Sequence, residues 1–486
     1  MVQVEKGNSM NVFCGAGKAG RKYLCMWRKC GLQVDYFADN NPELWGKKVE
    51  DVDVISMEDL KKLPPNANYY ITCKSVDVMR EQLISLGIPQ TSIRDCSITM
   101  NMYGYAMQQP GFIMPISVDE SIWEKCPAQV LFDFQNGMVL GGVESWSAQT
   151  AHKLKNLGWE SCFLISGTQP DAIEKNISFW NVGKLIHVEF ENTITEQETF
   201  ACLSNGIAKS GCRNIIINFP GYHLVAACLV KRAVPDKVKV IAVVHNDEAV
   251  YYTYYKMFEN YIDQCLVISE RIRDKMIKNG FPQAKLEYLP WEIACEEQFY
   301  HTYTSKYGHL RIGYAGRIET QQKRMDYLVE VVKRLKERRI DFKLEIAGNG
   351  SYKEQLAKEI SKNQLDREVQ ILGVLDAAEI REFWKRQDIM VSCSDWEGHS
   401  ISQGEAMAAG AVPVVTDVSG ASDDITDGEN GFIVEVGSVE QITEKIAYFY
   451  EHRELLPVMG EKAHQTILIN NNGKKLENLW RNLLLE

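Results

Sequence analysis

With 486 residues the chain is too long for a single hydrophobic core, and its length favours about three domains of roughly 150 residues each. A net charge of −11 argues against a protein that binds nucleic acid, while 45% hydrophobic and 24% charged residues are ordinary for a globular protein. Thirteen cysteines, none in a C-x-x-C pair, predict reduced thiols. The sequence does not start with the basic and then apolar residues of a signal peptide, and it has no run of ~18 apolar residues as in a membrane-spanning helix. We therefore expect a cytoplasmic protein. Peripheral contact with the inner face of the membrane stays open as an alternative.

Strand-like and helix-like patterns alternate along the chain, which predicts parallel sheets covered by helices. The first unit, residues 1–120, opens with a buried strand over 11–14, a helix over 21–30 and a second strand over 34–39. A G-x-G-x-x-G pattern follows the first strand, and an acid ends the second; these residues are Gly15, Gly17, Gly20 and Asp39. Such glycines let a diphosphate approach a helix N-terminus, and the acid can accept from a ribose hydroxyl. A Rossmann-like domain with an empty or regulatory pocket is the alternative.

The second unit is predicted to span residues 127–302 and the third unit residues 303–486. In the second unit Gly141 and Gly142 open a helix, and His245 directly follows a buried strand. The carboxyl ends of parallel strands are where active-site groups gather, so His245 is a candidate. The last helix of the chain is expected to pack back across the second unit.

Two cations follow the first strand of the third unit. Arg317 and Lys323 lie six residues apart after the strand over 310–315. Cations at the start of a helix oppose its dipole, so this placement favours a role in binding an anion such as a diphosphate. Two surface cations without a ligand are the alternative.

Later in the third unit, two acids stand on either side of a seven-residue segment. Glu397 and Glu405 are followed by small residues in a helical pattern and by a buried strand over 412–416. Together with the two cations, this pattern resembles the donor-binding signature of retaining glycosyltransferases with the GT-B fold, family 4 in particular. The resemblance spans residues 127–486. The first unit resembles the small Rossmann-like domains fused to bacterial polysaccharide-synthesis enzymes.

The resemblance implies a role for each matching residue. The matching Arg and Lys hold the donor diphosphate in that family, which assigns Arg317 and Lys323. Glu405 would accept from both ribose hydroxyls. Glu397 and His245 would lie against the transferred sugar, where His245 either orients a hydroxyl or stabilises charge.

Backbone groups complete the site that the resemblance implies. Gly142 would let the donor approach the helix that it opens, and the amides of Gly398, His399 and Ser400 would approach sugar and phosphate. His399 stands where the family more often has Phe, so it either contacts the donor or fills the loop. Glu144 completes a G-G-x-E pattern, and we expect it to serve as favourable charge in a first helical turn.

Structural alternatives remain for several of these residues. The spacing from Ser402 to Glu405 is also that of a capping box, in which Glu405 would bond back to the Ser402 amide. His245 could be a satisfied core histidine, and Glu397 a solvated loop acid. The stretch 290–293 reads Pro-Trp-Glu-Ile where the family often shows Pro-Asn-Gly, so the sequence departs from the family pattern at the hinge between the units.

Three other patterns are interpreted as structural. The acids of Asp51-Val52-Asp53 lie far from the signature and indicate a turn. Tyr252 and Lys256 have the Y-x-x-x-K spacing of short-chain dehydrogenases but lie over 230 residues from Gly15, so we expect an aromatic helix face, with lipid or acceptor contact as the alternative. The basic stretch 333–339 is most simply a solvated helix end, with membrane contact as the alternative.

The predicted fold class is α/β, with three Rossmann-like parallel-sheet units, the last two forming a GT-B glycosyltransferase around an inter-domain cleft. The predicted function is retaining, metal-independent transfer of a sugar from a nucleotide of the UDP or GDP type. The expected acceptor is a lipid-linked or glycan intermediate of bacterial surface-glycan synthesis. No metal site, no cofactor besides the donor and no nucleic-acid partner are expected, and a second nucleotide in the first unit is left open. The alternatives are a non-catalytic nucleotide-sugar scaffold or sensor and an NAD-dependent oxidoreductase or epimerase.

Overall fold

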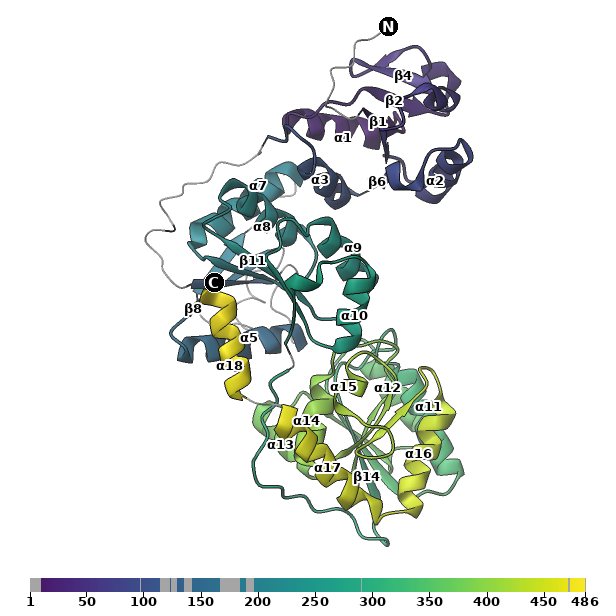
Figure 1. Ribbon diagram of the computed structural model, residues 1–486. Coiled ribbons are helices and arrows are strands. Elements are labelled where there is room, and N and C mark those ends of the chain that lie inside the picture. The colour runs from purple at the N-terminus through teal and green to yellow at the C-terminus, as the bar shows by residue number, and fades with distance from the viewer. Residues whose placement is uncertain are drawn as a thin grey trace.

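The computed structural model describes residues 10–96, 98–113, 123, 129–134, 142–166, 184–188, 196–289, 291–470 and 473–485. Figure 1 shows three α/β units in a row, each built around its own sheet. The predicted α/β class with three parallel-sheet units is confirmed. Each of the three predicted ranges contains one sheet.

The first unit has a six-stranded sheet in the order β3-β4-β2-β1-β5-β6. The β3–β4 pair is antiparallel, and the other pairs are parallel. Its strands are β1 (Asn11–Cys14), β2 (Tyr36–Asp39), β3 (Lys48–Val49), β4 (Val52–Ser56), β5 (Asn68–Ile71) and β6 (Ile93–Asp95). Its helices are α1 (Lys18–Lys29), α2 (Val76–Ser85) and α3 (Thr99–Met107).

The second unit has a seven-stranded parallel sheet in the order β13-β12-β11-β10-β7-β8-β9. Its strands are β7 (Gln129–Phe134), β8 (Glu160–Ser166), β9 (Lys184–Val188), β10 (Asn214–Ile217), β11 (Lys239–Val244), β12 (Gln264–Val267) and β13 (Leu286–Tyr288). The helices described for it are α5 (Gly142–Asn156), α7 (Glu196–Ser210), α8 (Tyr222–Ala233), α9 (Ala249–Met257) and α10 (Glu270–Lys278).

The third unit has a six-stranded parallel sheet in the order β16-β15-β14-β17-β18-β19. Its strands are β14 (Leu310–Ala315), β15 (Phe342–Ala347), β16 (Val369–Gly373), β17 (Ile389–Ser392), β18 (Val412–Thr416) and β19 (Phe432–Val434). Its helices are α11 (Met325–Glu337), α12 (Lys353–Lys362), α13 (Ala377–Lys385), α14 (Ile401–Ala409), α15 (Ala421–Asp424), α16 (Val439–Glu451) and α17 (Leu455–Asn470), and α18 (Gly473–Leu485) follows them.

The central strands form because they are almost continuous apolar runs, as parallel strands covered on both faces require. β10, β11, β17 and β18 are buried along nearly their whole length. In each sheet the first strand lies inside and chain connections leave it in both directions. Ligands bind beyond the carboxyl ends of strands at such a switch point, which is between β14 and β17 in the third sheet.

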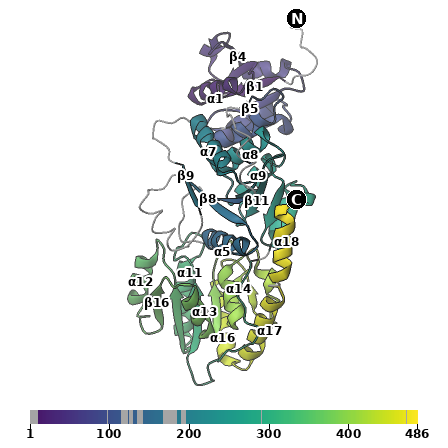
Figure 2. The ribbon, with the colours of Figure 1, turned by 90° about the vertical axis from the view of Figure 1, so that its left-hand side faces the viewer.

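The last helix crosses back to the second unit, as the sequence predicted (Figure 2). Lys239 Nζ on β11 donates to Leu483 O at 2.8 Å, and the Trp480 ring lies 6.3 Å from the Trp146 ring of α5. α18 therefore ties the end of the third unit to the second unit on one side of the cleft.

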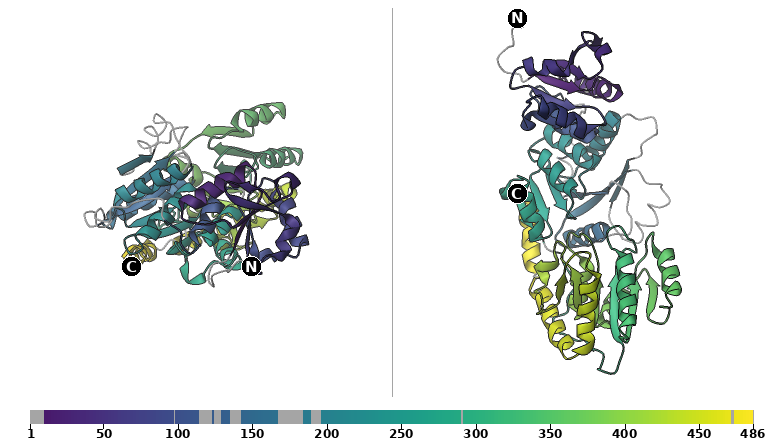
Figure 3. Two further views of the ribbon diagram at one scale, coloured as in Figure 1. Left: turned by 90° about the horizontal axis from the view of Figure 1, so that it is seen from above. Right: turned by 90° about the vertical axis from the view of Figure 1, so that its right-hand side faces the viewer.

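The first unit docks on the second through α3 (Figure 3). The Tyr103 and Phe200 rings are 4.5 Å apart, and Gln108 Nε2 donates to Met257 O at 3.0 Å. The predicted aromatic face of α9 is core at two rings: Tyr255 in the helix and Phe258 directly after it have no exposed surface. The alternative that this face touches a lipid or acceptor is wrong for these two rings. Within the described residues, no helix is both long and apolar enough to span a bilayer.

Candidate active site

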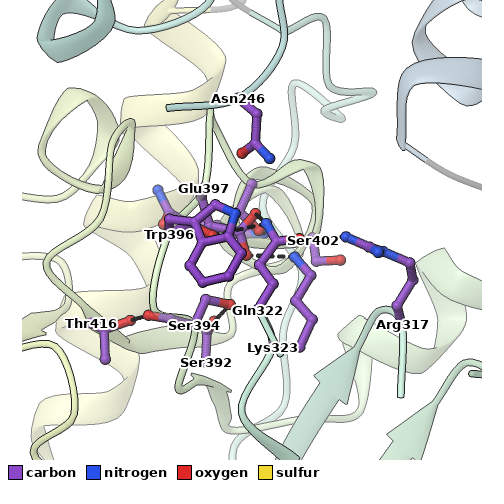
Figure 4. Close-up of polar contacts among 12 residues, drawn as sticks. Asn246, Arg317, Gln322, Lys323, Ser392, Ser394, Trp396, Glu397, Ser402 and Thr416 are labelled. Carbon is purple, nitrogen blue, oxygen red and sulfur yellow. Dashed lines mark hydrogen bonds and ion pairs between the residues drawn. The ribbon is translucent and has the colours of Figure 1, made fainter. Parts of the chain in front are cut away.

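Two loops at the carboxyl edge of the third sheet meet through an ion pair. Lys323 belongs to the loop between β14 and α11, and Glu397 to the loop between β17 and α14. Lys323 Nζ lies 2.5 Å from Glu397 Oε1, with 17% and 9% of the side chains exposed (Figure 4). The two candidates, 74 residues apart in sequence, are therefore brought together at the switch point of the sheet.

Gln322 connects the ion pair to the second cation, and sequence reasoning missed it. Its Nε2 donates to Trp396 O at 2.8 Å and lies 3.4 Å from Glu397 Oε2, while its Oε1 accepts from Arg317 Nη2. Only 6% of Gln322 is exposed. Its position between the two predicted cations was the available signal, but an amide carries no charge pattern of its own.

Arg317 is the exposed cation of this edge, with 55% of its side chain accessible. Its Nη1 is 3.8 Å from Glu319 Oε1, a weak and solvated contact. Burial raises the pKa of Glu144, in the first turn of α5, to about 7, and the charge of Arg317 partly offsets this shift. Glu144 therefore lies close enough to Arg317 for their charges to interact, and it occupies the predicted first turn.

A strained residue links the two loops. Arg324 has φ 50° and ψ 51°, in the left-handed region, which costs about 1–2 kcal/mol for a residue with a Cβ. Its guanidinium donates to Asp395 in the second loop at 2.9 Å and to Asp326 at 2.8 Å, and it lies 3.3 Å from the Tyr327 ring centre. These contacts offset the strain and fix the loop that carries Lys323.

Glu405 lies on α14, and its alternative role as a capping residue is wrong. The N-cap of α14 is Ser400, whose side chain accepts from Gln403 N at 3.3 Å. Ser402 is inside the helix and donates to Ala315 O at 2.7 Å. Glu405 instead lines a cavity of about 890 Å³ between the second and third units.

The surroundings of Glu405 hold it partly protonated near neutral pH. Burial raises its pKa to about 7, and the nearby Trp384 indole and the charge of Arg381 offset only part of this shift. Arg381 lines the same cavity from α13. An acid with such a pKa in a cleft is a candidate for ligand contact.

The second unit meets this site through His245. A Cβ at Gly398 would lie 2.0 Å from His245 O, so only glycine fits at this contact between the units. Gly142 opens α5 nearby, where an added Cβ would lie 3.9 Å from Ile401 of α14. Gly141 lies outside the described residues.

His245 is a neutral imidazole in an aromatic cage. Burial lowers its pKa to about 3. Trp146 and Trp291 flank it, with ring centres at 4.9 and 6.1 Å. Its Nε2 is 2.8 Å from Asn218 Oδ1, and its Nδ1 has no hydrogen-bond partner among the described residues. Of the two roles left open by the sequence, a neutral ring supports orienting a hydroxyl rather than stabilising charge as a cation.

His399 joins the second and third units, and both of its ring nitrogens are engaged. Nδ1 is 2.9 Å from Ile268 O, and Nε2 is 2.6 Å from Asp424 Oδ2. Both partners are acceptors, so both nitrogens carry protons and the ring is charged. Donor contact by the His399 side chain stays a prediction, and in this structure the ring serves the interface.

The hinge side of the cleft has further contacts between the units. Asp423 Oδ2 accepts from the backbone N of Glu270, at the start of α10, at 3.0 Å. Arg271 Nη1 donates to Asp417 O at 3.0 Å. Trp291, where the sequence departs from the family pattern, is 7% exposed and forms one side of the aromatic cage around His245.

In the first unit the glycine pattern leads from β1 into α1, which begins at Lys18 and contains Gly20, three residues before the predicted start at residue 21. Gly15 has φ 118°, and a Cβ at Gly20 would lie 2.0 Å from Gly15 O. Gly17 is the N-cap of α1. Asp39 closes the loop onto the neighbouring strand, because Oδ2 accepts from Ala16 N at 2.8 Å and Oδ1 from Asn41 N at 2.9 Å. Asp39 therefore has backbone partners in this structure, and ribose binding by it stays a prediction.

The acid pair at residues 51–53, the Tyr252 and Lys256 pattern and the basic stretch 333–339 were interpreted as structural, and their contacts within the chain can now be compared with that interpretation. Asp51, at φ 64°, lies in the predicted turn, whereas Asp53 belongs to β4, so the turn prediction is wrong for the second acid. Tyr252 Oη donates to Asp247 at 2.6 Å and Lys256 Nζ to Glu259 at 2.6 Å, so each side chain has its own acceptor. In the basic stretch, four cations have carboxylate partners: Lys333, Arg334, Lys336 and Arg338.

Residues 303–466 match the family described as glycosyl transferases group 1. The chain resembles poly(ribitol-phosphate) alpha-N-acetylglucosaminyltransferase of Staphylococcus aureus (strain COL), 30% identical over 164 residues, 33% of this chain and 32% of that protein. It also resembles poly(glycerol-phosphate) alpha-glucosyltransferase of Bacillus subtilis (strain 168), 33% identical over 124 residues, 25% of this chain and 18% of that protein. The chain thus spans a third or less of the length of these two curated relatives.

Solved structures share the fold over a larger part of the chain. The pneumococcal O-GlcNAc transferase GtfA in complex with UDP and GlcNAc aligns with a TM-score of 0.60 at 13% identity, covering 74% of this chain and 98% of that chain. A mutant of TarM from S. aureus, in complex with fondaparinux, alpha-GlcNAc-glycerol and UDP, aligns with a TM-score of 0.59 at 15% identity, covering 74% and 100%. The chain therefore has a GT-B fold and carries, over residues 303–466, a region similar to the group 1 glycosyltransferases.

Proposed function

We propose that the protein is a retaining, metal-independent glycosyltransferase that moves a sugar from a UDP- or GDP-type donor to a lipid-linked or polysaccharide acceptor. Two relatives that act on poly(ribitol-phosphate) and poly(glycerol-phosphate), by their names, support a role in bacterial surface-glycan synthesis. Membership of family 4, a cytoplasmic location with peripheral membrane contact, and the lack of a nucleic-acid partner belong to the same proposal.

The Lys323–Glu397 ion pair beside Arg317 is the observation that carries this proposal. We assign the departing diphosphate to Arg317 and Lys323, because cations from one loop can neutralise its growing charge. Glu397 and the neutral His245 would hold the sugar. Glu405 would accept from the ribose hydroxyls, since it faces a cavity and is not used as a cap.

We assign retention of the configuration at C1 of the sugar to attack by the acceptor oxygen on the same face of the ring from which the diphosphate departs. The bond from C1 to the diphosphate oxygen breaks, the acceptor oxygen bonds to C1, and its proton passes to the departing phosphate. A short-lived oxocarbenium-like ion pair separates the two events. The ion pair of Glu397 with Lys323 supports this path, because a carboxylate held by a cation is a weak nucleophile. Closure of the cleft would exclude water from the ion pair.

Calorimetry on the full chain tests the proposal. UDP, GDP and their common sugar conjugates are titrated with and without magnesium into wild type and Lys323→Ala. Lys333→Ala is the matched control, because Lys333 pairs with Glu330 on the outer face of α11. We expect binding of one nucleotide without metal, loss of that binding in Lys323→Ala, and no change in the control. Absence of binding to all of them, or the same number of bound nucleotides in Lys323→Ala as in wild type, would refute this donor site.

We also propose that the first unit binds a nucleotide of its own at the start of α1. The test is Gly17→Asp, since a Cβ at Gly17 meets nothing within 4 Å and its φ of −73° suits any residue. The new carboxylate would repel a diphosphate at the helix N-terminus. Nucleotide binding that survives Lys323→Ala and is lost in Gly17→Asp is the expected result, and a single site removed by Lys323→Ala alone would contradict it.

A further inference from the structure

A chain of buried polar side chains runs along the carboxyl edge of the second sheet to His245. Ser166 Oγ lies 2.8 Å from His223 Nε2, and His223 Nδ1 lies 3.1 Å from Asp133 Oδ2. Asp133 contacts Asn218, and Asn218 contacts His245. Each of the five is at most 7% exposed. The proposed roles of Glu397, Arg317 and Lys323 leave four of these residues unexplained.

The orientation of the Asn218 amide follows from its partners. Asn218 Nδ2 is 2.9 Å from Asp133 O, a backbone carbonyl that can only accept, so this atom must be the NH₂ group. Ser147 Oγ lies at 3.3 Å from the same nitrogen. The backbone N of Asn218 donates to Asp133 Oδ1, which holds the residue from a second side. Asn218 Oδ1 therefore has to be the atom that faces His245.

This orientation selects the tautomer of His245. Asn218 Oδ1 can only accept, so His245 Nε2, 2.8 Å away, carries the proton. Burial between Trp146 and Trp291 keeps the ring neutral, with a pKa of about 3. A neutral ring with a proton on Nε2 has a bare lone pair on Nδ1, and Nδ1 has no partner among the described residues.

We propose that Asn218, held by Asp133, is a positioning residue that fixes His245 with Nδ1 as an acceptor for a hydroxyl group of the transferred sugar. This inference rests on the proposed function, because it needs a donor sugar beside His245. The opposite tautomer would present an N–H at Nδ1 and would favour a carbonyl or carboxylate there. Asn218 thus makes the position that faces His245 selective for a group that donates a hydrogen bond, such as a hydroxyl, over one that only accepts.

The tautomer can be measured without any substrate. Full-length protein labelled with ¹⁵N in its nine histidines is examined by long-range ¹H–¹⁵N NMR, and His245→Gln identifies the signal. We expect a protonated Nε2, a bare Nδ1 and no titration between about pH 5.5 and 8.5. Asn218→Leu keeps the shape of the side chain but removes the acceptor, and we expect the signal to become a mixture of tautomers. Ser147→Ala is the matched control, because Asn218 Nδ2 keeps its bond to Asp133 O.

Each outcome decides the inference. A wild-type ring protonated on Nδ1, a ring that titrates near its ordinary pKa, or an unchanged tautomer in Asn218→Leu would overturn it. If Asn218→Leu does not fold, Asn218→Ala replaces it: it also removes the acceptor for Nε2, so an unchanged tautomer there would overturn the inference.

Activity then separates this inference from the proposed function. With a donor that the wild type uses, kcat/KM should fall about tenfold in Asn218→Leu, the worth of one neutral hydrogen bond, and stay within about twofold in Ser147→Ala. An unchanged kcat/KM in Asn218→Leu would overturn the positioning role. If no UDP- or GDP-sugar is used by the wild type, the proposed function fails, and with it the role assigned to the lone pair, whereas the tautomer measurement still tests Asn218.

Discussion

Replacing Asp424 with asparagine tests the ion pair that His399 forms at the junction of the second and third units. His399 Nε2 is 2.6 Å from Asp424 Oδ2, and the two side chains are 5% and 8% exposed. Removing one partner of a buried pair costs about 3–5 kcal/mol. The imidazole can release its proton, so we expect the lower end, about 3 kcal/mol. For a cooperative unit of about 150–250 residues this lowers Tm by roughly 6–12 °C.

The pH dependence of the stability that Asp424→Asn loses distinguishes a charge effect from a packing effect. Burial alone would lower the pKa of His399, but the charge of Asp424 and hydrogen bonds to Asp424 and Ile268 O raise it on balance. The pKa of Asp424 is lowered because, against burial, the charge and hydrogen bond of His399 favour its ionised form.

The sign of each contribution follows from these directions. A histidine with a raised folded pKa stabilises fully below its unfolded pKa of about 6.5, and this stability is lost as pH rises through the folded pKa. The contribution of Asp424 is present above its unfolded pKa of about 3.9 and is lost as pH falls through the lowered folded pKa. The pair therefore stabilises most between about pH 4 and pH 6.5.

Urea unfolding of the full chain at about pH 5.5 and about pH 9 measures this effect. Asp423→Asn is the matched control: it removes the neighbouring carboxylate but keeps an acceptor for the backbone N of Glu270. We expect Asp424→Asn to lose about 3 kcal/mol at the lower pH and clearly less at the higher, and the control to lose under about 1 kcal/mol. An equal loss at both pH values, or none, would refute the charged pair.

Three further changes test the cleft. Lys323→Met should destabilise the third unit by about 3 kcal/mol, because it leaves Glu397 buried without its cation. In the double variant that also carries Glu397→Gln, thermal unfolding should show recovered stability, whereas donor binding should stay lost. Gly398→Ala should abolish transfer and lower Tm, since its Cβ would lie 2.0 Å from His245 O and force the two units apart; unchanged Tm would show that the units do not meet there. Glu405→Gln should weaken calorimetric binding of the donor about tenfold without loss of stability, whereas lost stability with intact binding would return the residue to a structural role.

The three parallel sheets were within reach of the sequence because their central strands are short, almost continuous apolar runs, whereas the order of the strands within each sheet needed the structure. The rule that ligands bind at the carboxyl edge then located Arg317, Lys323 and His245 without any knowledge of contacts. The cleft loops themselves needed the structure. The Lys323–Glu397 pair joins residues 74 apart, and no local pattern encodes such a contact.

Contacts between units were the least predictable part of the site. His399 contacts Ile268 O, 131 residues earlier, and nothing around His399 in the sequence identifies that partner. The capping-box alternative for Glu405 failed because the same spacing occurs inside a helix when the chain enters two residues earlier, at Ser400. Asn218 was findable in principle, since it follows β10 at the same edge as His245, but a polar residue at a strand end has many uses.

Two acids in the cleft have a pKa raised to about 7, and they make opposite predictions for donor binding. Glu405 accepts best from ribose when ionised, so affinity should rise about tenfold from about pH 6 to about pH 8 if only that form binds. Ionised Glu144, beside Arg317, would repel the diphosphate, so its effect has the opposite sign. A UDP-sugar is the right probe, because its diphosphate does not titrate in this range. Calorimetry should find that the rise in donor affinity with pH is steeper in Glu144→Gln and absent in Glu405→Gln. If donor affinity instead falls with pH, and this fall disappears in Glu144→Gln, then Glu144 and not Glu405 controls donor binding.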